Sequence, residues 1–164
     1  MSDAEDQVPI DQREPVLVSA CLLGMNCRYD GASNLDAPLV EALASQGCIA
    51  VPFCPEERGG LTTPRPAASI ERENAAAVVE GNSRVLTREG ADVTAEFLHG
   101  AEQARETCQD QGIRRAFLKE RSPSCGVRQT HVGDQLVDGR GLTAEILLRA
   151  GVQVVGVEGR RRED

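Results

Sequence analysis

The chain has 164 residues, a length typical of one domain that buries its own hydrophobic core. Hydrophobic residues make up 40% and charged residues 27%, which excludes a disordered chain, and no apolar run reaches the roughly 18 residues of a membrane-spanning helix. The formal net charge of −8 disfavours non-specific binding to nucleic acid or to an anionic membrane.

The two ends of the chain differ from its middle. Residues 1–14 are acidic and polar and predict a disordered tail, while residues 159–164 form a charged end. We interpret residues 15–158 as a single domain. Neither a secretory signal nor a lipidation motif is found, so we expect the cytoplasm as compartment. In that reducing environment, the six cysteines are expected to serve as metal ligands or catalytic thiols rather than as disulfides.

Short apolar runs alternate with amphipathic segments along this domain. The expected strands are 16–20, 49–53, 116–118 and 152–157; the expected helices are a segment from Asn34 or Asp36 to Gln46, 94–111 and 144–150; and a small hairpin is expected at 76–87. Thr94 and Thr143 are the predicted caps of the later helices. Residues 54–66 and 127–141 are rich in turn formers and predict loops. The alternation predicts an α/β domain with a mostly parallel sheet between helices, in Rossmann-like layering.

Three cysteines follow predicted strands within a few residues. Cys21, Cys54 and Cys125 stand in loops beside glycine, proline and serine. Since ligands of open α/β sheets bind outside the carboxyl ends of the strands, we expect these thiols to converge at one edge of the sheet. Cys48 and Cys108 stand at a helix end and on an apolar helix stripe, and are expected to be structural.

Cys27 lies in the same loop as Cys21, and its role stays open. The gap between the two is wider than in a zinc knuckle or a thioredoxin-type pair. Cys27 is a candidate fourth ligand, a candidate reactive thiol or a structural residue. Three thiols without a nearby histidine favour an iron–sulfur cluster over a single zinc ion. A cluster held by three thiolates keeps one iron open as a Lewis acid.

Several motifs around these cysteines resemble the thiouracil desulfidase (TudS) family, formerly a domain of unknown function. The motifs are Ser19-Ala-Cys-Leu-Leu-Gly24, Cys27-Arg-Tyr-Asp-Gly31, Cys54-Pro-Glu56, Gly59-Gly-Leu61, Thr63-Pro-Arg65, Leu118-Lys119, Ser122-Pro-Ser-Cys-Gly126 and Gly141-Leu-Thr-Ala144. Their order along residues 15–158 makes the resemblance specific.

The resemblance implies a compact α/β domain with a 4Fe–4S cluster held by Cys21, Cys54 and Cys125, with one iron open. It implies removal of sulfur from a thiolated pyrimidine, in which thiocarbonyl and water give carbonyl and hydrogen sulfide without net redox change. The extra domain of relatives that act on transfer RNA is not found. The expected substrate is therefore a small thiolated base, nucleoside or nucleotide, such as thiouracil, thiouridine or its monophosphate.

Polar residues of the same loops are candidates for proton transfer and substrate binding. Glu56 and a serine of Ser122-Pro-Ser124 match the polar catalytic positions of the family, with Cys27 beside them. Arg28, Arg65 and Lys119 are candidates to bind a phosphate of the substrate or to stabilise a negative charge that develops on it.

Two other classes of function remain open from the residues alone. One is a binding module that holds a cluster or zinc without catalysis, as a sulfur carrier or sensor. The other is a metal-free thiol enzyme, which lacks an obvious paired histidine. Oligomeric state is not predicted by the sequence.

Overall fold

The computed structural model describes Pro9 and residues 12–159. Most of the predicted tail over 1–14, and all but the first residue of the charged end over 159–164, lie outside the described residues. The first strand begins at Glu14. Among the described residues, no helix combines the length and the apolar character needed to cross a membrane.

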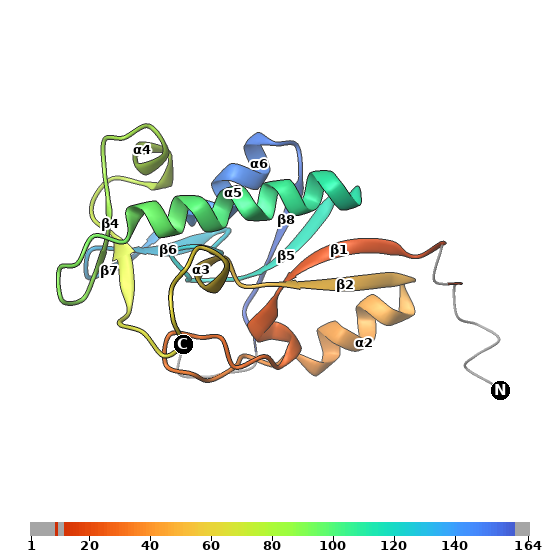
Figure 1. Cartoon of the computed structure of the whole chain (residues 1–164). Coiled ribbons are helices and arrows are strands. Elements are labelled where there is room, and N and C mark those ends of the chain that lie inside the picture. Colours follow the sequence, from red (N-terminus) through yellow and green to blue (C-terminus); the bar gives the residue numbers. More distant parts are fainter. Residues whose placement is uncertain (1–8, 10–11, 160–164) are drawn as a thin grey trace.

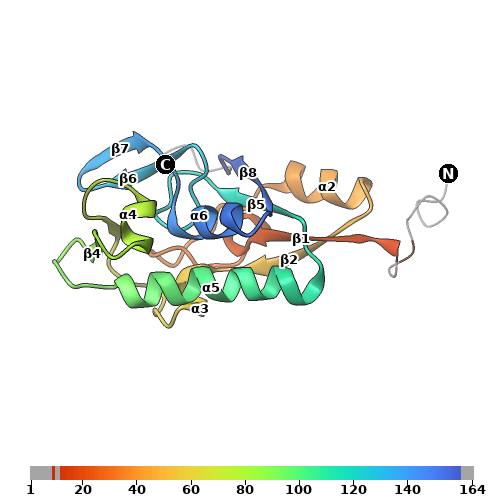
Figure 2. The same ribbon diagram turned by 90° about the horizontal axis from the view of Figure 1, so that it is seen from above.

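A four-stranded parallel sheet forms the centre of the fold, with the strand order β2-β1-β5-β8. These strands are β1 (Glu14–Ser19), β2 (Cys48–Phe53), β5 (Arg115–Lys119) and β8 (Gln153–Val157). Three helices flank this sheet: α2 (Ala37–Ser45), α5 (Thr94–Gln111) and α6 (Leu142–Arg149). Figures 1 and 2 show α5 and α6 on one face of the sheet and α2 on the opposite side. The predicted α/β layering is confirmed.

The alternating side chains of β1 explain why helices are needed on both faces. Leu17 packs in a core with Ala104 of α5 and Leu147 of α6, while Val16 and Val18 pack in a second core with Leu43 of α2. Parallel strands buried on both faces are typical of such sheets, because the crossover helices cover them.

A second sheet, which the sequence did not reveal, stands beside the first. Its order is β4-β3-β6-β7, and its strands are β3 (Ala68–Ile70), β4 (Val85–Thr87), β6 (Gln129–Val132) and β7 (Gln135–Asp138). β6 and β7 form an antiparallel hairpin inside the stretch predicted as a loop. Their polar side chains gave no strand signal, because one side of this hairpin faces solvent.

The hairpin expected at 76–87 is wrong. Residues Ala75–Val79 form helix α4, which begins where the side chain of Asn74 accepts a hydrogen bond from the Ala77 backbone N–H at 2.9 Å. β4 instead pairs with β3. An alanine run behind an asparagine cap favours a helical turn, and this local preference outweighs the turn signal at Gly81.

The predicted threonine caps are also wrong: neither threonine side chain caps its helix, and the Thr94 N–H donates instead to the Asp92 carboxylate at 2.9 Å. α5 follows Val93 without a side-chain cap, and the Thr94 hydroxyl accepts from the Val85 N–H instead. α6 follows Gly141 without a side-chain cap, and the Thr143 N–H donates to the Ser124 carbonyl. A helix start needs partners for its N–H groups, which a neighbouring loop supplies here.

A glycine of α5 lets a short helix pack closely against α5. Helix α3 (Pro55–Arg58) lies in the segment expected to be all loop, and a Cβ on Gly100 would lie 1.9 Å from the carbonyl oxygen of its Pro55. The contact fixes α3, and Cys54 at its start, against α5.

We expect Gly100→Ala to lower the free energy of unfolding by about 1–3 kcal/mol, because the backbone of α3 must move away from the new methyl group. Urea unfolding measures this change. Glu106→Ala, at an exposed position of the same helix, is the control. A stability equal to or above that of the wild type, as helix propensity alone predicts for alanine, would show that the contact is not tight.

Candidate active site

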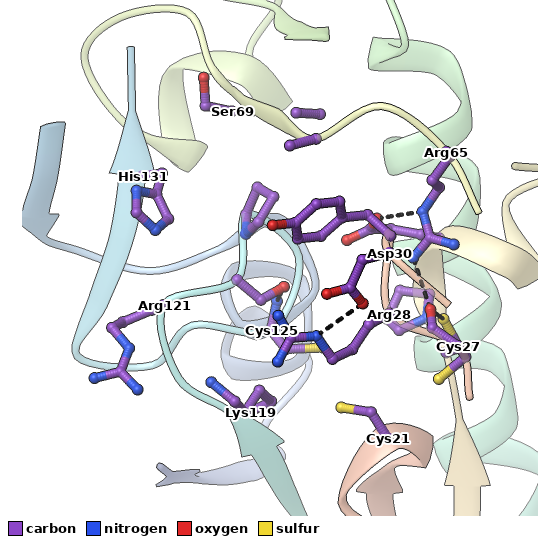
Figure 3. Close-up of a pocket in the computed structure, with 18 of the residues that line it drawn as sticks. Cys21, Cys27, Arg28, Asp30, Arg65, Ser69, Lys119, Arg121, Cys125 and His131 are labelled. Carbon is purple, nitrogen blue, oxygen red and sulfur yellow. Dashed lines mark hydrogen bonds and ion pairs between the residues drawn. The ribbon is translucent and has the colours of Figure 1, made fainter. Parts of the chain in front are cut away.

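The three cysteines predicted to converge line one cavity at the carboxyl edge of the parallel sheet. Cys21 lies in the 3₁₀ helix η2 (Ala20–Leu23) after β1, Cys54 follows β2, and Cys125 lies in the loop after β5. All three, together with Cys27, line a cavity of about 890 Å³. In Figure 3, Cys21, Cys27 and Cys125 lie at one end of the cavity, with Ser69 and His131 at the other.

Cys27 lies between two of the predicted ligands. The Cys54 thiol donates to the carbonyl oxygen of Cys27 at 3.7 Å, and the neighbouring thiols of Cys21 and Cys54 raise the pKa of Cys27 well above its usual range. A side-chain hydrogen bond from Cys27 is the main reason why the pKa of Cys21 falls to about 7 and why that of Cys54 is lowered. The loop of residues 21–31 therefore brings a fourth thiol to the same cavity.

A buried asparagine supports this cluster of thiols. The Asn34 side-chain amide donates to the Cys21 sulfur at 3.6 Å, and its oxygen accepts from Arg28 at 2.8 Å. The sequence suggested only a helix cap for Asn34, but Asp36 provides that cap. The role at Cys21 was missed because nothing in the local pattern shows where an amide in a loop points.

Cys125 is buried, with 5% of its surface exposed. Burial raises the pKa of Cys125, against the effect of a hydrogen bond with Ser19. The Ser122 hydroxyl accepts from the backbone N–H groups of Ser124 and Cys125 at 3.1 and 3.0 Å, so it shapes the turn that presents the thiol. Cys48 and Cys108 do not line the cavity and pack in the two hydrophobic cores, as expected.

Glu56 is held by two residues that are distant in sequence. Arg65 donates through Nε to one carboxylate oxygen at 2.8 Å, and the buried Ser124 hydroxyl donates to the other at 3.1 Å. Arg65 also donates to the carbonyl oxygen of Cys27 at 2.9 Å. The structure therefore brings Glu56, Arg65 and Ser124 together beside the thiols. Ser122, in contrast, lies on the cavity wall.

Three cationic side chains lie in the lining near the thiol end of the cavity, two of them paired with carboxylates of the same lining. Arg28, Arg65 and Lys119 all line it, and Lys119 is buried, with its ammonium group 2.9 Å from the Glu120 carbonyl oxygen. Arg121 and His131 line the cavity further toward the second sheet, as Figure 3 shows. Burial and these neighbouring cations lower the pKa of His131.

The residues of the cavity fit an iron–sulfur cluster. Thiolates are the usual ligands of such clusters, and nearby cations with an amide donor offset the negative charge of a cluster and its ligands. Within the part of the chain that the structure describes, no three His, Cys, Asp or Glu side chains surround a single point as a mononuclear zinc site requires. A multi-iron cluster is held at its corners and takes thiolates from more widely spaced positions.

Comparison with known proteins places this fold and site in one family. The model of the 2-thiouracil desulfurase family matches residues 16–158, so the chain belongs to this family. A solved structure described as the [4Fe-4S]-dependent thiouracil desulfidase TudS is similar, with a TM-score of 0.75 and 45% sequence identity over 88% of this chain and 91% of that chain. The uncharacterized protein YbbK of Bacillus subtilis is 35% identical over 143 residues, 85% of this chain and 93% of that protein.

Proposed function

We propose that the chain is a [4Fe-4S]-dependent desulfidase that converts a thiolated pyrimidine and water into the corresponding carbonyl compound and hydrogen sulfide. The observation that carries this proposal is the convergence of Cys21, Cys54 and Cys125 on one cavity, in a chain of the 2-thiouracil desulfurase family. The two rival classes, a binding module without catalysis and a metal-free thiol enzyme, are less favoured by this combination.

The cluster would be held by the sulfur atoms of Cys21, Cys54 and Cys125, with one iron left without a protein ligand. When bound, it supplies a Lewis-acidic iron that polarises the bond between carbon and sulfur. Cys27, which lines the same cavity, would remain near the cluster as an additional thiol. The cations Arg28 and Lys119 stabilise negative charge that develops on the substrate.

Glu56 would accept a proton from the attacking water and return it to the leaving sulfur. Its carboxylate lines the cavity two residues from Cys54, and Arg65 and Ser124 hold both oxygens in place. A carboxylate whose orientation is fixed on both sides is suited to proton transfer. Ser124 is then a positioning residue that acts through Glu56, while Ser122 on the cavity wall is the serine able to contact the substrate.

The size of the cavity favours a substrate larger than a free base. Its volume of about 890 Å³ extends from the thiols to the second sheet, where Arg121 and His131 stand. The Nε atom of Arg121 is buried without a hydrogen-bond partner among the described residues. A sugar or a sugar phosphate would occupy this region, which favours thiouridine or its monophosphate. The protein would act in the cytoplasm.

The test is anaerobic purification followed by iron and sulfide analysis, a visible spectrum, and turnover of thiouracil, thiouridine and thiouridine monophosphate. We expect a 4Fe–4S cluster, loss of the thiocarbonyl absorbance and equal amounts of carbonyl product and sulfide. Removing the cluster should abolish turnover, and reconstitution should restore it. A cluster without turnover of any substrate would support the binding module, and turnover by the metal-free chain would support the thiol enzyme.

Ser124→Ala is expected to lower kcat about tenfold with the cluster retained, because a hydrogen bond to a charged group contributes about 1.5–3 kcal/mol. Steady-state sulfide release measures this change. Ser45→Ala, at an exposed position of α2, is the control and should match the wild type. An unchanged kcat in Ser124→Ala would remove this serine from the proposal.

A further inference from the structure

A buried carboxylate closes the loop that carries Ser124 and Cys125. Glu120 directly follows β5 and is 1% exposed. Its Oε1 accepts from the backbone N–H groups of Val127, Arg128 and Gln129 at 3.0, 3.0 and 3.2 Å. Its Oε2 accepts from the N–H and the Nε of Arg128 at 3.2 and 3.0 Å. The side chain thus joins the residue before the loop to the residues after it.

The neighbouring strand leaves room for this carboxylate. A Cβ on Gly156 of β8 would lie 1.7 Å from the Glu120 Oε2 atom. β8 therefore accommodates the Glu120 side chain only because position 156 has no side chain. This close approach is independent of the hydrogen bonds and indicates the same fixed position for the carboxylate.

Glu120 is ionised in this position. Burial raises the pKa of Glu120, but the hydrogen bonds from the Arg128 side chain and from the backbone N–H groups outweigh it, so the pKa lies below its usual value. An amide of the same shape would turn its own N–H atoms toward some of these donors, so glutamine cannot reproduce the contacts.

The loop between Glu120 and Val127 contains no helix or strand. Its shape is set by hydrogen bonds such as those at Ser122, and by Glu120 where the two ends of the loop meet. Side chains of such a loop keep their directions only while these contacts hold.

We propose that Glu120 is a positioning residue of the desulfidase site: its carboxylate fixes the loop so that Cys125 faces the cluster and Ser124 meets Glu56. This inference rests on the proposed function for its catalytic consequence. Glu120 also lines the cavity beside Lys119, whose ammonium group donates to the Glu120 carbonyl oxygen. The same residue therefore links the cation and the thiol loop.

The first test compares the alkylation rates of two buried thiols in the full-length chain. Cys125 is 5% exposed and Cys108 is 3% exposed, but only Cys125 depends on the loop. In Glu120→Gln we expect iodoacetamide to modify Cys125 about ten- to a hundredfold faster than in the wild type, because backbone N–H groups at the end of the loop lose their buried acceptor. Peptide mass analysis measures the rate. The rate at Cys108 should stay unchanged. Equal rates at Cys125 in both proteins, or equal acceleration at both thiols, would overturn the inference.

Two further variants separate a positioning role from loss of a buried charge. Gly156→Ala keeps the carboxylate but displaces it, so it should accelerate alkylation of Cys125 in the same way. Glu145→Gln alters another buried carboxylate, on α6, which pairs with Arg140 and Arg149. This variant should leave Cys125 protected. Acceleration in Glu145→Gln equal to that in Glu120→Gln would contradict a specific role for Glu120.

The second test is the electron paramagnetic resonance spectrum of the reduced protein. A variant that only folded less well would show the wild-type line shape at lower intensity. We expect Glu120→Gln to change the line shape itself, because a ligand of the cluster shifts. An unchanged line shape would overturn the inference. The alkylation test does not need turnover. An inactive wild type in which Cys125 is protected would refute the proposed function, and the alkylation rates of the variants would still decide the role of Glu120.

Discussion

Replacing Cys125 by alanine is expected to abolish cluster binding and sulfide release together. Cys125 is the one thiol that the loop after β5 brings to the cavity. Alanine offers no ligand. Only the thiols after β1 and β2 would remain, and a cluster would lose the thiolate ligand from the loop after β5. Iron analysis and the visible spectrum of the anaerobically purified variant measure cluster content, and the thiouracil assay measures sulfide.

Cys108→Ala is the matched control for this variant. Cys108 is as buried as Cys125 and lies in the same hydrophobic core, but it does not line the cavity. We expect it to keep both the cluster and the activity. If Cys125→Ala held as much iron as the control, the ligand set would have to be assigned again, with Cys27 in place of Cys125.

Glu56→Gln is expected to lower kcat by about 10²–10⁴-fold with the cluster intact, the range by which proton transfer from a positioned side chain accelerates a reaction. Glutamine keeps the shape of the side chain and can still accept a hydrogen bond from Arg65, but it cannot take a proton from water near neutral pH. Single-turnover formation of the carbonyl product, monitored beside the cluster absorbance, separates lost proton transfer from lost cofactor.

The neighbouring Glu57 provides the control for the loss of one carboxylate from α3. Its side chain is exposed and accepts from the hydroxyl of Thr63, outside the cavity lining. Glu57→Gln should turn over at the wild-type rate. A Glu56→Gln variant with near-full turnover and an intact cluster would show that another group moves the proton.

The parallel sheet was predictable because its signals are local and periodic. The runs around Val16, Ile49, Phe117 and Val154 are apolar on both faces, as strands covered by helices must be. The second sheet was missed, since a strand such as Gln129–Val132 has polar side chains and only one covered face. The short apolar run at Ala75–Val79 predicts a strand of a hairpin as well as a helix, because periodicity alone does not separate the two in so few residues.

The place where the chemistry gathers could be predicted from the positions of three cysteines along the chain. Cys21, Cys54 and Cys125 follow parallel strands, and the carboxyl ends of parallel strands share one edge of a sheet. The contacts within that edge could not be predicted and appear only in the folded chain: Cys54 on the Cys27 carbonyl oxygen, Asn34 on Cys21, and Ser124 on Glu56 across 68 residues of sequence. Loop conformations have no periodicity that a sequence can show, and hydrogen bonds between distant loops depend on where the sheet places the ends of those loops.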